Sequence, residues 1–164
     1  MEEVINMGYQ ADAADRELIA ALRRGDRPSI TDLARMVAMA RGTVQTRLAR
    51  LVDTGVIQGW GPELSASAVG YGVTSFTAVS ISQGALARVI EGLAAMPEVL
   101  EVHVTTGRAD LLCRIVARSN DHLHELVQAI VALDGVARTD SQLALAAPID
   151  RSLADLVAAE VATS

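Results

Sequence analysis

Hydrophobic residues recur every three or four positions through the first third of the chain, which is the spacing of a buried helical face. This pattern predicts three helices within residues 12–57. The first opens at Asp12 or Asp15 and ends before the turn cluster Gly25–Pro28, because a residue that precedes proline disfavours the helical conformation. Only a short break separates the next two helices, so the three together indicate a helix-turn-helix unit.

The second predicted helix begins at Ser29, which forms a capping-box pair with Asp32. The third runs from about Arg41 and stops at Gly55, because glycine adopts the left-handed terminal conformation without a steric penalty. The residues at the start of this helix, and on or beside the face opposite its apolar stripe, are Arg41, Gly42, Thr43, Gln45, Thr46, Arg47 and Arg50. A rigidly held helix with such a face is suited to the major groove of DNA.

From residue 73 the hydrophobic period changes to the alternation of half-buried strands. The pattern predicts strands at 73–82, 99–106, 110–117 and 136–147, and helices at 84–96 and from Asn120 or Asp121 to Leu133. The order β-α-β-β-α-β is the ferredoxin-like arrangement, so the fold class is α+β. Helices cover only one face of such a sheet, yet the strand at 110–117 is apolar on both faces. We expect the open face to meet a second copy of the same sheet.

The charge of the chain is distributed unevenly between its two parts. Residues 12–62 hold eight arginines and six acids, whereas residues 63–164 hold six arginines and twelve acids. The helical part therefore has a net charge of +2 within a chain of net charge −6. Because +2 is weak for a DNA-binding unit, we expect several copies to act together on one DNA.

Several function classes are excluded by what the sequence lacks. Cys113 is the single cysteine, and no two of the histidines His103, His122 and His124 are four residues apart on a helix, so no metal site is predicted. The sequence contains neither a Walker motif nor the Gly-x-Ser-x-Gly of esterases, and it has no paired catalytic carboxylates. We therefore expect no enzyme and no cofactor. Without a signal peptide or a membrane span, a cytoplasmic protein is expected.

The order of these parts resembles the Lrp/AsnC family of bacterial and archaeal transcription regulators over roughly residues 12–150. The matching residues are Asp12, Asp15, Ser29–Ala34, Thr43–Leu48, Leu51, Gly55–Ile57 and Val104–Leu111. The resemblance implies a regulator that binds double-stranded DNA as a homodimer or as a ring of dimers such as an octamer. It also implies that the C-terminal domain binds a small effector, usually an amino acid, at an interface between subunits.

Carried over by position from the family, the effector-binding residues are Thr106, Gly107, Arg108 and Asp110, with Thr139 and Ser141 on the last strand. A glycine loop offers backbone N–H groups to a carboxylate, and an acid can pair with an α-ammonium group. The chain departs from the family at Ala40, which lacks the oxygen of a helix cap; this omission typically costs ~1 kcal/mol. It also departs at Ala109, where the family often has an aromatic residue in the effector loop. This difference predicts a roomier pocket or an altered ligand.

These observations divide the chain into five segments. We expect a flexible tail at 1–11, a helix-turn-helix DNA-binding domain at 12–57, a hinge strand or linker at 58–72, a ferredoxin-like effector-binding and oligomerisation domain at 73–150, and a C-terminal helix or tail at 151–164. Residues 56–62, which run into the hinge segment, predict a short wing-like or hinge strand with Trp60 packed at the junction.

Some alternatives stay open at the level of sequence. Arg47 has a second possible role in an ion pair with an acid such as Asp32 or Asp53, and Asp110 has one as a simple turn residue. Two other functions also fit the pattern. One is a tetrapyrrole (sirohaem) decarboxylase, an enzyme class that resembles the Lrp family in fold. The other is a DNA-organising protein without an effector.

Overall fold

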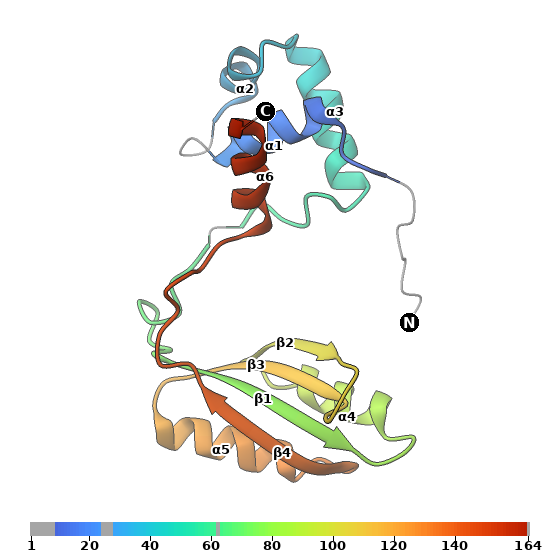
Figure 1. Ribbon diagram of the computed structural model, residues 1–164, viewed down its shortest axis with the longest axis vertical. Helices are drawn as coiled ribbons and strands as arrows, with labels where there is room; N and C mark the ends of the chain where they lie inside the picture. Colours follow the sequence, from blue (N-terminus) through green and yellow to red (C-terminus); the bar gives the residue numbers. More distant parts are fainter. Residues whose placement is uncertain (1–8, 24–27, 62, 164) are drawn as a thin grey trace. The chain divides into compact units, whose positions relative to one another are not determined.

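The computed structural model describes residues 9–23, 28–61 and 63–163 (Figure 1). It divides into two compact units: the first contains residues 1–62 together with 149–164, and the second contains residues 63–148. The predicted tail at 1–11 and the turn at Gly25–Pro28 fall mostly outside the described residues. The sequence predicts a separate C-terminal helix or tail, and the structure shows a helix that belongs to the first unit.

The described residues of the first unit form four helices. They are α1 (Ala13–Arg23), α2 (Ile30–Met36), α3 (Arg41–Asp53) and α6 (Leu153–Thr163). Buried aliphatic residues from α1, α2 and α3, among them Leu18, Leu33 and Leu51, form a single core. Helix α6 packs against α1, with ion pairs from Arg23 to Asp155 at 2.6 Å and from Arg16 to Glu160 at 2.5 Å. The return of the chain to α1 was not predicted.

The local signals for α2 and α3 are confirmed. The N–H of Ser29 donates to Asp32 and the N–H of Asp32 donates to Ser29, each at 3.2 Å, so the capping box is present. Helix α3 starts after Ala40 with no side-chain cap, as the sequence predicts. Gly55 follows the end of α3 with a φ of +72°, in the left-handed region. The predicted three-helix arrangement is therefore correct.

The predicted wing-like strand at 56–62 is wrong for the described residues 56–61, which contain no strand. The N–H of Ile57 donates to the carbonyl of Leu51 at 2.9 Å, so the chain turns back on α3 instead of extending. Two glycines further disfavour a strand here, because glycine loses the most conformational freedom on ordering. The side chain of Trp60, expected to pack at the junction, is 60% exposed.

The second unit is the predicted βαββαβ arrangement. Its four strands form an antiparallel sheet in the order β2-β3-β1-β4. The elements are β1 (Val73–Ile81), α4 (Leu86–Ala94), β2 (Val99–Val104), β3 (Leu111–Ala117), α5 (Asn120–Val131) and β4 (Val136–Leu143). One core joins Val89 of α4, Ile130 of α5 and Cys113 of β3, so both helices cover the same face of the sheet.

The other face of the sheet is left open, and its composition is mixed. Phe76 and Leu112 lie on adjoining strands and are 43% and 38% exposed. Arg114, on the same face, forms an ion pair with Glu101 at 2.7 Å. The open face therefore has apolar residues flanked by charged ones.

Several element ends differ from the prediction. Strand β4 ends at Leu143 rather than at 147, because its only neighbour is β1 and the last paired residues are Ser75 and Leu143. Strand β2 ends at Val104 rather than at 106. The cap of α5 is Ser119, whose hydroxyl accepts from the N–H of His122 at 3.1 Å, and not Asn120 or Asp121 as predicted.

Candidate nucleic-acid interface and effector loop

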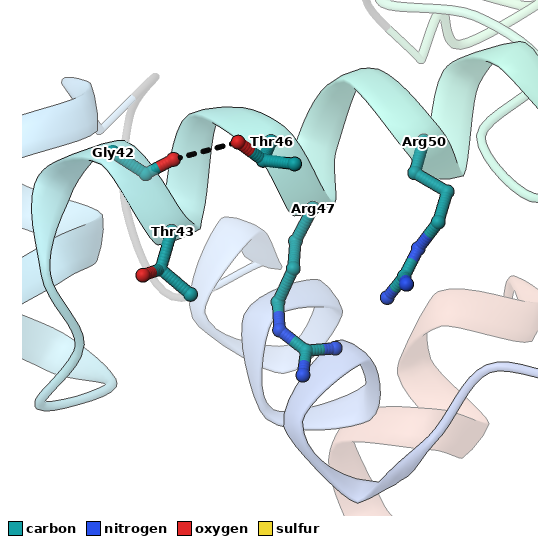
Figure 2. Close-up of a pocket in the computed structure, with 5 residues that line it drawn as sticks. All are labelled: Gly42, Thr43, Thr46, Arg47 and Arg50. Carbon is teal, nitrogen blue, oxygen red and sulfur yellow. Dashed lines mark hydrogen bonds between the residues drawn. The ribbon is translucent and has the colours of Figure 1, made fainter.

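Helix α3 presents most of the residues that the sequence singles out for DNA. Arg41, Thr43, Gln45 and Thr46 are exposed, as is the backbone at Gly42. A shallow hollow of about 420 Å³ is lined by Gly42, Thr43, Thr46, Arg47 and Arg50. Figure 2 shows these five residues along α3. The hydroxyl of Thr46 donates to the carbonyl of Gly42 at 3.0 Å, which fixes its oxygen against the helix. The exposed side of α3 is thus a polar surface on a rigid helix.

Arg47 is held by two acids at the start of α1. Its Nη1 lies 2.9 and 2.8 Å from the two carboxylate oxygens of Asp12 and 2.7 Å from Oδ1 of Asp15. Figure 2 shows the side chain directed from α3 toward α1. The pairing of Arg47 within the chain was one of the open alternatives, but the partners suggested, Asp32 and Asp53, are wrong. Asp32 pairs instead with Arg35, at 2.8 Å.

Arg50 also contacts Asp15, but the contact is longer. Its Nη2 lies 3.3 and 3.4 Å from the two carboxylate oxygens. Its guanidinium carbon stands 4.7 Å from the centre of the Tyr9 ring, a cation–π contact. The hydroxyl of Tyr9 in turn donates a hydrogen bond to Asp15. Tyr9, Asp15 and Arg50 therefore form a closed set of three contacts.

These contacts keep all the charges of the cluster in place at neutral pH. Burial opposes the ionisation of Asp15, yet hydrogen bonds from Tyr9 and Arg47 hold its pKa below its usual value. The hydrogen bond from Arg47, and then that from the backbone of Asp15, lower the pKa of Asp12. Hydrogen bonds to Asp12 and Asp15 raise the pKa of Arg47. The cluster is an ionised network, and the sequence predicted its acids only as helix-opening residues.

The predicted effector loop connects β2 to β3. Thr106, Gly107 and Arg108 are exposed, and Gly107 has a φ of +132°, which favours glycine. Asp110 anchors the end of the loop to β1: its carboxylate accepts from the N–H of Ile81 at 2.8 Å. The N–H of Asp110 donates to the carbonyl of Val79 at 3.1 Å. Asp110 thus has a structural role as a turn residue.

The two predicted effector residues on β4 have different surroundings. Thr139 is paired with Val79, the same residue that accepts from Asp110, so Thr139 and the loop meet the same stretch of β1. Ser141 is paired with Thr77, and their hydroxyl oxygens are 3.0 Å apart. Thr77 is fully buried whereas Ser141 is exposed, so this contact joins the core to the solvent-facing edge of the sheet.

In the described part of the chain, no three or more potential metal-ligating side chains gather into a cluster. None of the helices in these described ranges has the length and apolarity to cross a membrane.

A helix-turn-helix unit joined to a ferredoxin-like unit defines a two-part DNA-binding protein of the transcription-regulator class. Two family models match the chain accordingly. The winged helix-turn-helix DNA-binding model matches residues 12–58, and the Lrp/AsnC ligand binding domain matches residues 74–154. The chain belongs to the Lrp/AsnC family of transcriptional regulators.

Named relatives agree with this assignment. An uncharacterized HTH-type transcriptional regulator of Pyrococcus furiosus is 31% identical over 137 residues, 83% of this chain and 92% of that protein. The regulatory protein AsnC of Escherichia coli is 28% identical over 151 residues, 88% of this chain and 97% of that protein. These relatives are regulators and not enzymes, which disfavours the tetrapyrrole decarboxylase considered from the sequence.

Solved structures show the same fold. The structure of E. coli AsnC has a TM-score of 0.82 at 27% identity and covers 89% of this chain and 99% of that chain. A feast or famine regulatory protein of M. tuberculosis, complexed with L-methionine, has a TM-score of 0.78 at 25% identity. It covers 86% of this chain and 96% of that chain.

Proposed function

We propose that this protein is a sequence-specific transcriptional regulator that assembles through its second unit and responds to an amino acid or a related small molecule. The observation that carries the proposal is the exposed polar surface of α3, held on a helix-turn-helix core (Figure 2). Side chains of this kind can reach base edges and phosphates when a helix lies in the major groove.

The proposed contacts to DNA come from the exposed side of α3. They are made by Arg41, Gly42, Thr43, Gln45, Thr46 and Arg50. The amide of Gln45 suits adenine and an arginine suits guanine, whereas threonine serves either a base or a phosphate. Arg47 is not in this set because Asp12 and Asp15 already hold its guanidinium.

Assembly is proposed to use the open face of the sheet. Phe76 and Leu112 supply apolar surface there, and a second copy of the same face is a self-complementary partner in a twofold dimer. The low charge of the first unit supports the same conclusion, because two linked units raise the effective concentration of the second binding event. Dimers are expected to associate further into a larger ring.

The effector is proposed to meet the loop of Thr106, Gly107 and Arg108. The backbone at Gly107 and the cation of Arg108 suit a carboxylate. Thr139 is paired with Val79 of β1, the residue to which the end of the loop is also hydrogen-bonded. The relative bound to L-methionine makes an amino acid the first ligand class to test. We expect thermal-shift screening against the amino acids to reveal one that raises the melting temperature, since a ligand of the folded state must do so. No shift with any of them would favour a DNA-organising protein without an effector.

DNA binding is tested by footprinting the DNA around the protein's own gene with the wild-type chain and with Thr43→Ala and Gln45→Ala. Both variants are expected to lose the footprint or change its sequence preference. Arg88→Ala is the matched control, because Arg88 is an exposed residue of the second unit that pairs with Asp134 at 3.1 Å. An unchanged footprint in both α3 variants would overturn the assignment of α3 as the DNA-reading helix.

A further inference from the structure

We propose that Asp15 is a positioning residue of the DNA interface and that it divides two arginines of α3 between two roles. Arg47 stays with Asp12 and Asp15 at the start of α1 and fixes the helix, whereas Arg50 leaves Asp15 for a DNA phosphate. This inference rests on the DNA-binding function proposed above and specifies which cation of that site meets the DNA.

Asp15 is the centre of the arrangement. Its residue surface is 0% exposed, although it is an ionised side chain. It accepts from the hydroxyl of Tyr9, from the N–H of Asp12 at 3.2 Å, and from the guanidinium groups of Arg47 and Arg50. A buried carboxylate is strongly unfavourable without compensating partners, so at least one arginine must remain when the other leaves.

The geometry identifies Arg47 as the arginine that remains. It makes three contacts between 2.7 and 2.9 Å and neutralises two acids at once, and its side chain is only 23% exposed. Moving this guanidinium to DNA would leave Asp12 without its cation and Asp15 with only the longer contacts of Arg50. The half-exposed Asp12 carboxylate would then repel the approaching phosphates.

The geometry equally identifies Arg50 as the arginine that moves. Its side chain is 43% exposed, its contacts with Asp15 are 3.3 and 3.4 Å, and the rest of its support is the ring of Tyr9. When it leaves, Asp15 keeps Arg47, Asp12 and Tyr9. In the free protein the cluster therefore holds Arg50 in an ordered position from which little has to be broken.

The salt dependence of DNA binding separates the two roles. Neutralising one phosphate contributes about 0.9 to the slope of log affinity against log salt concentration. Two charge-balanced variants are compared with the wild-type protein on a random-sequence duplex. Arg50→Gln with Asp53→Asn is expected to reduce the slope by about 0.9. Arg47→Gln with Asp15→Asn is expected to leave the slope unchanged, because no buried carboxylate then holds Arg50 back and no phosphate contact is lost.

A coupling measurement tests Asp15 itself. The loss of DNA affinity caused by removing Arg50 is measured in the wild-type chain and again in the Asp15→Asn variant. The two losses should differ by more than about twofold. Removing the exposed Arg41 should change the affinity by the same factor in both backgrounds. A merely structural role of Asp15 would lower the active fraction alike in all variants, which would leave the effects additive and overturn the proposal.

The wild-type protein provides a further test that needs no variant to fold. A dicarbonyl reagent for arginine, read by mass spectrometry, should modify Arg50 in the free protein and much less when the duplex is bound. Arg47 should react slowly in both cases. Reaction of Arg47 that DNA suppresses, or a slope loss in the Arg47 variant, overturns this inference while DNA binding stands. A wild-type chain that binds no duplex overturns the proposed function, and this inference with it.

Discussion

Gly135 should be among the positions of the second unit that are most sensitive to a single added methyl group. It lies between α5 and β4 with a φ of +101°, a conformation that other residues rarely adopt. A Cβ built on it would be 2.3 Å from the Cβ of Ala85 and 3.4 Å from Val89. The Cβ atoms of residues 85 and 135 are both fixed to the backbone and cannot move apart by a change of rotamer. Gly135→Ala must therefore move the backbone.

The expected loss follows from two contributions. Left-handed backbone strain in a residue with a Cβ is roughly 1–2 kcal/mol. Overpacking at a site that cannot relax through a rotamer is roughly 1–3 kcal/mol. Together they lower the free energy of unfolding by about 2–5 kcal/mol. A unit of this size is stable by roughly 4–13 kcal/mol, so the substitution removes a large part of its stability.

Urea denaturation followed by circular dichroism measures this loss. Gly107→Ala is the matched control: its φ is +132°, but a Cβ there meets nothing within 4 Å, so only the strain contribution applies. Adding Ala85→Gly to Gly135→Ala removes the overlap and should recover the stability that the overlap costs. The single variant Ala85→Gly completes the double-mutant cycle. Equal losses at Gly135 and Gly107, or no coupling between Gly135 and Ala85, would refute the reasoning.

Three further predictions concern the first unit. Ala40→Ser should supply the missing cap of α3 and raise the free energy of unfolding by about 1 kcal/mol in denaturant titration; no gain would mean that the introduced hydroxyl does not reach the N–H groups of the first turn. Hydrogen bonds from Ser152 and Arg23 lower the pKa of Asp155 from 3.8 to about 2. The ionised Asp155 therefore stabilises the fold fully above pH 3.8, the pKa of the unfolded chain, and this stabilisation is lost as the pH falls from 3.8 to about 2. Asp155→Asn should remove this pH-dependent loss from melting curves recorded at a series of pH values. Deleting residues 149–164 should lower the melting temperature of the first unit and leave that of the second unchanged, as differential scanning calorimetry would show.

The sequence was most informative where a signal is local. The alternation of Leu111, Cys113 and Ile115 defines a strand face, and all three are fully buried in the sheet core. The absence of a cap at Ala40 and the stop at Gly55 are properties of a few neighbouring residues, and both are observed. Strand ends were less predictable, because β4 ends where its pairing with β1 stops, at Ser75 and Leu143, although β1 itself begins at Val73.

Contacts between distant residues could not be inferred in the same way. The partners of Arg47 are 35 and 32 positions away, and the candidates suggested from the sequence were nearer acids. A signal was nevertheless present: Asp12 and Asp15 have the same three-residue spacing as Arg47 and Arg50. This spacing places Arg47 and Arg50 on one face of α3, and it brings the two acids together at the start of α1. Helix α6 gave no comparable signal for its docking on α1.

The internal pairing of the arginines explains why assembly should dominate the affinity for DNA. Arg16, Arg23, Arg35 and Arg47 are all in ion pairs within the first unit. Two of their partners, Asp155 and Glu160, lie outside residues 12–62, so the net charge of +2 for those residues overstates the field that DNA meets. Each copy then offers few cations to phosphates, and the affinity of one copy should be low. Linking two copies raises the overall affinity without any new kind of contact, because the second copy binds at a high effective concentration. Loss of assembly should therefore weaken DNA binding more than any single substitution on α3, and dilution below the dimer dissociation constant should have the same effect.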